Sequence, residues 1–183
     1  MPDTITLPKP GVYTVDLAHS SVAFVARHLI GSKVRGHFSE FTGTITIADP
    51  IEQSSVEAEV TVASVDTGQE MRDGHLKTGD FFEVEKFPTW TLKSTALAKK
   101  SDEEWVLTAD LTVKGVTKSL EFDVEYLGSG PGMAPDSTVL GLSASTTIDR
   151  RDFGVSFAGA LETGSLVVSN KVKIEIDIEA ALS

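Results

Sequence analysis

The segment KVKIEIDIE, residues 171–179, decides the class of fold, because its apolar and charged residues alternate without a break. One valine and three isoleucines occupy every second position, and lysine, glutamate and aspartate fill the positions between them. Successive side chains of a β-strand point to opposite faces, so this period of two predicts a strand with one dry face and one wet face.

The same alternation recurs along most of the chain. It is clear at residues 56–62, 107–113 and 119–126. Further strands are expected at residues 11–16, 21–29, 34–47, 89–97 and 139–149, which gives about nine strands in all. Residues 69–82 lack the pattern and are expected to form a short helix or a coil, and residues 128–138 a flexible loop. The chain is therefore predicted to be an all-β protein with one short helix.

These strands are expected to form one antiparallel domain. No linker and no internal repeat divides the 183 residues. Closing the sheet into a barrel removes its edge strands, so we expect a single antiparallel β-barrel of about eight strands. The interior of such a barrel is filled by side chains or holds one small ligand. Small residues on the predicted dry faces would leave room for a ligand, but they are also ordinary core residues: Ala26, Ala58, Ala96, Ala109 and Ala144.

The first ten residues, MPDTITLPKP, contain three prolines and are expected to form a flexible leader, with the barrel domain at residues 11–183. They lack the basic and continuous apolar regions of a secretory signal, so we expect a cytoplasmic protein. No apolar run reaches the roughly 18 residues that a membrane-spanning helix needs, so no membrane span is expected.

Charge and cysteine content exclude several classes of function. The chain has 16 Lys and Arg residues against 27 Asp and Glu residues, a net charge of −11. Nucleic acid is not an expected partner, because binding it requires a basic surface that displaces counterions. The absence of cysteine excludes disulfides, a thiolate nucleophile and cysteine-ligated zinc. The four histidines show no metal-ligand spacing, so no metal site is expected.

His28 is the histidine best placed to meet a ligand. It shares the predicted dry face of strand 21–29 with Phe24 and Ala26 and ends that strand. At the mouth of an apolar barrel its imidazole could bond the polar head of a ligand. The alternative is a histidine bonded to a loop carbonyl.

A second polar group, Asp16, His19 and Ser20, places an acid, an imidazole and a hydroxyl close together in the sequence. Such a set could serve acid–base catalysis. The alternative is a loop in which these side chains bond the local backbone. Arg150 and Arg151, beside two aspartates, could likewise form a salt-bridged barrel rim or a clamp on an anionic head group.

Five motifs, taken together and in order, resemble those of the YceI-like family. They are YTVDLAHSSVAFVARH (13–28), VRGHFSEFTG (34–43), RDGHL with DFF and FP (72–76, 80–82, 87–88), LTVKGVT (111–117) and IDRRDFG (148–154). Each motif is modest alone, but five in this order are specific. The resemblance runs from about residue 11 to residue 180 of the chain.

The resemblance implies an extended, lipocalin-like barrel whose apolar pocket holds a polyisoprenoid or similar long-chain amphiphilic lipid, of the isoprenoid quinone or prenyl phosphate type. It implies non-catalytic binding, storage or transport of that lipid, with no cofactor, and in some relatives a link to stress responses. Many members of the family carry a secretory leader and work in the periplasm.

On this basis we expect a ligand site inside the barrel. Its wall would come from dry-face residues, its lid from the segment without alternation, and its head-group contacts from three basic residues. The wall candidates are Phe24, Ala26, Trp90, Leu92, Leu107, Phe122 and Val124. The lid candidates are Leu76, Phe81 and Phe82, and the head-group candidates are His28, Arg72 and Arg150. For all of them the alternative is plain core packing.

Three functions are weighed at this stage. The leading hypothesis is the lipid-binding protein. The second is an enzyme acting on an isoprenoid or small hydrophobic substrate, with His28 or the Asp16, His19 and Ser20 group as acid–base residues. The third is an interaction module with a filled core, which would need an exposed apolar patch that the alternation does not provide. An incompletely closed barrel edge could also pair two copies as a homodimer.

Overall fold

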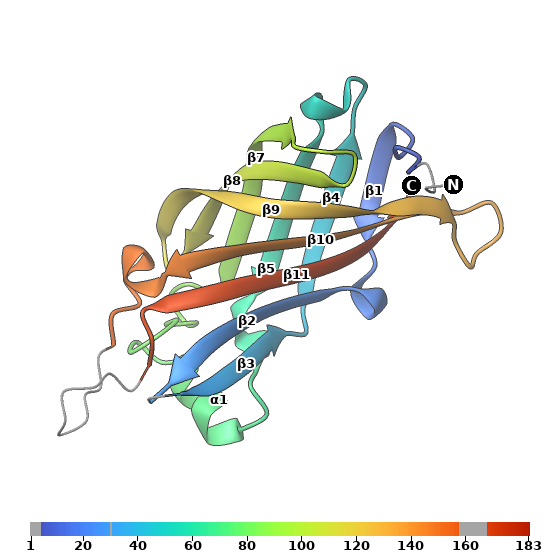
Figure 1. The fold of residues 1–183 in the computed structure, drawn as a ribbon. Coiled ribbons are helices and arrows are strands. Elements are labelled where there is room, and N and C mark those ends of the chain that lie inside the picture. The colour runs from blue at the N-terminus through green and yellow to red at the C-terminus, as the bar shows by residue number, and fades with distance from the viewer. Residues whose placement is uncertain (1–4, 30, 158–167) are drawn as a thin grey trace.

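The computed structural model describes residues 5–29, 31–157 and 168–183. It is an antiparallel barrel, as the alternation predicts, and its ring closes because β1 pairs with β11. The eight strands of the ring, in order around it, are β1 (Gly11–Val15), β4 (Phe41–Ile47), β5 (Ser55–Thr61), β7 (Thr89–Lys99), β8 (Glu104–Val113), β9 (Val116–Pro131), β10 (Thr138–Asp149) and β11 (Lys171–Leu182). Figure 1 shows the long strands β9, β10 and β11 crossing the front of the barrel.

Three further strands extend the sheet beyond β11. They are β2 (Ser21–His28), β3 (Ser32–Phe38) and β6 (Val65–Asp66). β10 occupies one edge of β11, so β1 and β2 share the other edge: β1 pairs with residues 180–182 and β2 with residues 173–177. The barrel is therefore extended at the end where β2 and β3 lie (Figure 1).

The helices are short. The α-helix α1 (Glu70–Leu76) lies at the end of the barrel opposite the chain termini (Figure 1). The 3₁₀ turns are η1 (Leu17–His19), η2 (Ile51–Gln53), η3 (Val62–Ser64) and η4 (Arg150–Phe153). The helix expected within residues 69–82 is thus confirmed. Among the described residues, no helix is both long and apolar enough to cross a membrane.

Most strand ends lie within three residues of the predicted ones, β6 was not predicted, and two differences are larger. The stretch 34–47 is two strands, because the chain turns at Ser39 and Glu40, whose backbone groups bond to Ser64 and Thr61. Conversely, residues 128–131, predicted as loop, continue β9. The bulge that places Leu127 outside the ladder and the positive φ of Gly128 let this long strand bend without ending.

A second bulge changes which residues of β7 face the interior, so the dry face predicted to include Ala96 is wrong. The pairing of β7 with β8 shifts register between Ser94 and Ala96. Ser94 Oγ accepts a hydrogen bond from the Val56 backbone N–H at 2.8 Å. Because one extra residue reverses the alternation, Ala96 is exposed and Leu97 faces the interior.

Candidate ligand-binding cavity

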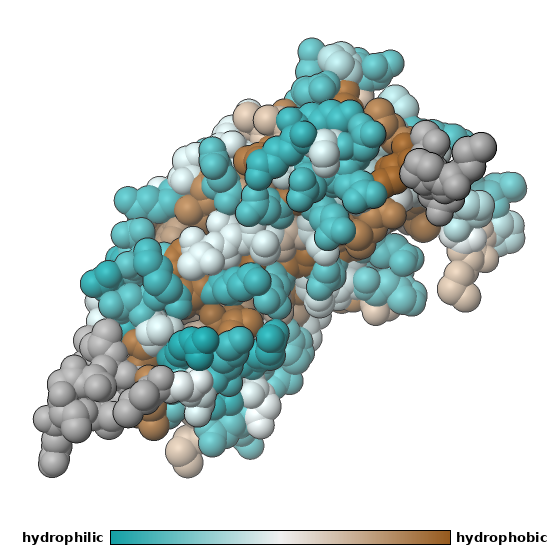
Figure 2. Space-filling model, in the orientation of Figure 1, coloured by the Kyte–Doolittle hydropathy of each residue, from teal (hydrophilic) through white to brown (hydrophobic). Residues whose placement is uncertain are grey.

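A cavity of about 210 Å³ lies inside the barrel. Ten of the strands, all except β6, contribute to its walls, and nearly all the side chains that reach it are apolar. The outside differs: Figure 2 shows hydrophilic residues over most of the visible face, with apolar residues gathered mainly beside the N-terminus.

Most of the predicted wall lies around this cavity. Six of the seven candidates line it: Phe24, Trp90, Leu92, Leu107, Phe122 and Val124. Ala26, two residues beyond Phe24 on β2, is not in the lining. Of the small dry-face residues, Ala58 and Ala144 line the cavity, whereas Ala109 is fully buried in the packing between Leu107 and Phe122.

The wall also contains residues that were not singled out. Among them are Val22, Phe38, Ile45, Trp105, Leu140, Ile174, Ile176 and Ile178. The alternation puts the three isoleucines of β11 on a dry face, but it does not separate residues that reach a cavity from those that pack on each other. That difference depends on where along the barrel axis a residue lies, and the alternation of apolar and polar residues gives no information on this position.

One end of the cavity is closed by aromatic rings, and we call it the closed end. Its buried cluster consists of Phe38, Val62, Val65, Phe81, Phe82 and Val155, with Leu76 packed against it. The ring of Phe82 lies 5.0 Å from Trp90 and 6.5 Å from both Phe24 and Phe38, between centroids. The three residues expected to form a lid therefore pack directly behind the wall at this end.

The other end, which we call the mouth, is covered by residues 5–10. Leu7 and Pro8 line the cavity, and Leu7 is 48% exposed. Two buried tyrosines anchor this segment: the Tyr126 hydroxyl donates to the Thr6 carbonyl at 2.8 Å and the Tyr13 hydroxyl to the Lys9 carbonyl at 2.9 Å. Burial raises the pKa of both phenols, so both remain donors at neutral pH. Residues 5–10 of the segment expected to be a flexible leader are thus bonded to the barrel, and its residues 1–4 lie outside the described part of the chain.

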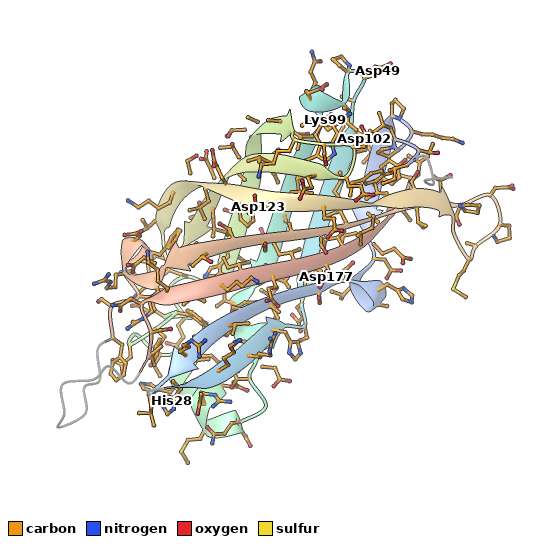
Figure 3. All side chains as sticks on the ribbon, viewed as in Figure 1. His28, Asp49, Lys99, Asp102, Asp123 and Asp177 are labelled. Atoms are coloured by element: carbon orange, nitrogen blue, oxygen red, sulfur yellow. The ribbon has the colours of Figure 1, made fainter. Side chains whose placement is uncertain are left out.

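The three head-group candidates lie outside the cavity lining. His28 ends β2, where its backbone bridges to Val168, and Figure 3 shows it at the opposite end of the barrel from Asp49. Arg72 bonds the hydroxyl and the carbonyl of Thr67 at 2.7 and 2.8 Å, which ties α1 to the segment before it.

Arg150 is only 5% exposed and serves the backbone. Its guanidinium donates to the carbonyls of Val155 and Ser169 at 2.8 and 3.0 Å and to the side-chain oxygen of Asn170 at 3.3 Å. The rim arrangement is instead made by Arg151, which holds the pKa of Asp149 well below its usual range through paired hydrogen bonds.

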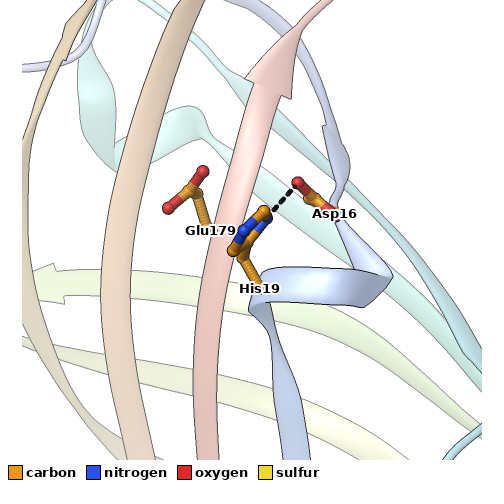
Figure 4. A group of neighbouring side chains, drawn as sticks. All are labelled: Asp16, His19 and Glu179. Carbon is orange, nitrogen blue, oxygen red and sulfur yellow. Dashed lines mark hydrogen bonds and ion pairs between the residues drawn. The ribbon is translucent and has the colours of Figure 1, made fainter. Parts of the chain in front are cut away.

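The Asp16, His19 and Ser20 group lies in the turn between β1 and β2, and Figure 4 shows two of its members, Asp16 and His19, beside Glu179. Asp16 caps η1, and its other carboxylate oxygen lies 2.8 Å from His19 Nδ1. Ser20 Oγ accepts from the Glu179 N–H at 3.0 Å and donates to the Glu179 carbonyl at 3.2 Å. The serine therefore bonds to β11 at the point where β1 gives way to β2, and its hydroxyl donates to the Glu179 carbonyl and not to His19.

The same turn between β1 and β2 brings together three side chains that could hold a cation. Asp16, His19 and Glu179 each offer one ligand atom, and these atoms lie within 4.8 Å of one another. The cluster lies outside the cavity lining, and the cap and the histidine contact account for its geometry.

The closed ring and its apolar interior define a lipocalin-like antiparallel barrel. The family model described as YceI-like domain matches residues 13–180. The chain therefore belongs to the YceI-like family.

Relatives and solved structures agree with this assignment. The UPF0312 protein SA2479 of Staphylococcus aureus (strain N315) is 38% identical over 173 residues, 93% of this chain and 98% of the relative. The YCEI protein of Campylobacter jejuni is 28% identical, with a TM-score of 0.74 over 86% of this chain and 90% of that one. A polyisoprenoid-binding domain from Saccharophagus degradans shares the fold at 15% identity, with a TM-score of 0.69 over 96% and 100% of the two chains.

Proposed function

We propose that the protein binds a polyisoprenoid or similar long-chain amphiphilic lipid inside the barrel and stores or carries it without chemical change. The observation that carries this proposal is the cavity inside the barrel, lined nearly throughout by apolar side chains. Membership in the YceI-like family supports it, and the solved domain of the same fold is described as polyisoprenoid-binding.

The energetics favour such a ligand. Burying an apolar tail gains roughly 0.8 kcal/mol for each CH₂-sized group, whereas association costs about 4–15 kcal/mol in lost freedom. A tail of about five buried carbons therefore offsets the lower end of that range, and a cavity of about 210 Å³ has room for it. A closed barrel also removes the tail from water without leaving an apolar groove open to other proteins.

The polar groups favour binding over catalysis. Ser20, which would be the nucleophile of a catalytic set, is hydrogen-bonded to both backbone groups of Glu179. Arg150 is bonded to carbonyl oxygens. These side chains hold strands and turns in place, and none of them lines the cavity.

Native mass spectrometry with added prenyl lipids tests the proposal. The wild type is expected to take up one lipid, and Ala58→Trp, which fills the cavity, to lose it while its circular dichroism stays that of a barrel. Ala96→Trp is the matched control, because it adds the same bulk to the exposed face of β7. Refusal of every prenyl lipid by the wild type would contradict the proposal.

A further inference from the structure

Trp90 carries an unusual polar group. Its indole Nε1 is the one buried side-chain nitrogen or oxygen, among residues 5–29, 31–157 and 168–183, that has no hydrogen-bond partner. Leaving a buried donor unpaired is unfavourable, and buried polar groups without a partner are rare. A donor of this kind on the wall of a binding cavity points to a ligand atom that accepts its hydrogen bond.

The position of Trp90 tells where in the cavity that acceptor would lie. Trp90 lines the cavity and packs against the cluster of the closed end. Its ring meets Phe38 and Phe82 edge to face, with centroids 4.8 and 5.0 Å apart. The N–H itself is buried among its neighbours, so an acceptor reaches it only when one of them moves.

The charges around the closed end tell which acceptor fits. The cavity lining of the described residues contains no lysine, arginine or histidine. The basic residues of η4 and α1 lie outside the lining and already have partners: Arg150 and Arg72 bond to carbonyl oxygens, Arg151 bonds to Asp149, and His75 bonds to Asp80. The residues beyond the described part of the chain, 1–4, 30 and 158–167, include no lysine or arginine. A phosphate at this end would be a buried anion without a counter-charge, which is strongly unfavourable.

We infer that the lipid enters head first, and that its head is a neutral acceptor which takes the hydrogen bond of Trp90 Nε1 at the closed end. The tail then runs through the barrel towards Leu7 at the mouth. This rests on the proposed function and narrows it: quinone carbonyls and prenol hydroxyls meet the requirement, and prenyl phosphates do not.

Trp90→Phe tests the inference, because it keeps an aromatic ring and removes the N–H. Binding is measured with a prenyl quinone, with squalene, which has a similar tail but no oxygen, and with a prenyl phosphate. The variant is expected to bind the quinone about three- to tenfold more weakly and squalene as the wild type does. Trp105→Phe is the control, since Trp105 also lines the cavity, and it is expected to affect the quinone and squalene alike.

Nuclear magnetic resonance gives a second readout, because the chain has two tryptophans and therefore two indole N–H signals. The Trp90 signal is expected to move downfield with the quinone and not with squalene. Equal effects of Trp90→Phe on quinone and squalene, or tighter binding of the phosphate than of the quinone by the wild type, would overturn the inference alone. If the wild type binds none of the three, the proposed function fails as well.

Discussion

At the scale of single residues, Gly36 sets the position of a wall side chain. It pairs with Phe24 across β2 and β3, and a Cβ at Gly36 would collide with three atoms of the Phe24 ring. The Phe24 ring therefore lies over the glycine, and the space on the other side of the ring is left to the cavity.

Gly36→Ala is expected to push Phe24 towards the cavity. We predict a loss of about 1–3 kcal/mol in the free energy of unfolding, because the site becomes overpacked, together with weaker lipid binding. Urea unfolding and lipid titration measure the two effects. Gly130→Ala in β9 is the matched control, since a Cβ there meets no atom within 4 Å. Equal behaviour of the two variants would show that Phe24 adjusts without strain.

The Asp16–His19 pair predicts a dependence on pH. The Asp16 carboxylate raises the pKa of His19 above its ordinary value of 6.5, and His19 lowers that of Asp16. The histidine contribution to stability is therefore complete below pH 6.5 and is lost as pH rises through the raised pKa. The aspartate contribution is lost as pH falls through its lowered pKa.

In Asp16→Asn, the His19 pKa is expected to fall towards 6.5, because the negative charge is gone. Titration of the imidazole signals by nuclear magnetic resonance measures it, with the other three histidines of the chain as internal references. A His19 titration unchanged by the substitution would contradict the contact.

At the scale of elements, the N-terminal segment over the mouth is expected to control exchange of ligand. Tyr126→Phe removes the hydrogen bond to the Thr6 carbonyl and keeps the ring. One such bond contributes about 0.5–1.5 kcal/mol, so release of a bound prenyl lipid should become about two- to tenfold faster. Stopped-flow fluorescence measures the rate, and Tyr13→Phe, which frees Lys9, should act in the same direction. An unchanged rate in both variants would mean that lipid leaves by another route.

The alternation predicted the elements well and their ends poorly. It located the strands because each has one face in the core, as β11 shows most clearly. It missed the turn at Ser39 and Glu40 and the bulges at Leu127 and Ser94, since tertiary hydrogen bonds and pairing register, not local pattern, fix them. The same limit applies to Arg150, whose carbonyl partners are Val155, just after η4, and Ser169, just before β11.

At the scale of the whole molecule, charge is expected to govern the approach to a membrane. The net charge is −11, and hydrophilic residues cover most of the face in Figure 2. Anionic vesicles should repel the protein, so lipid uptake from them should become faster as salt screens the repulsion. Uptake from zwitterionic vesicles should change little with salt. Transfer of a fluorescent prenyl lipid measures both, and faster uptake from anionic vesicles at low salt would contradict the prediction.

The pairing of β1 with β11 also brings the first strand beside the C-terminal residue, with the Ser183 N–H bonded to the Val12 carbonyl at 2.8 Å. The connectivity of the ring is therefore nearly circular. A permuted chain, joined at the present termini and reopened between Pro131 and Thr138, would preserve every strand pairing of the barrel. The order of the strands along the chain is thus separable from how the barrel closes, and a permutation would place the new termini between β9 and β10, at the end of the barrel where β1 meets β11.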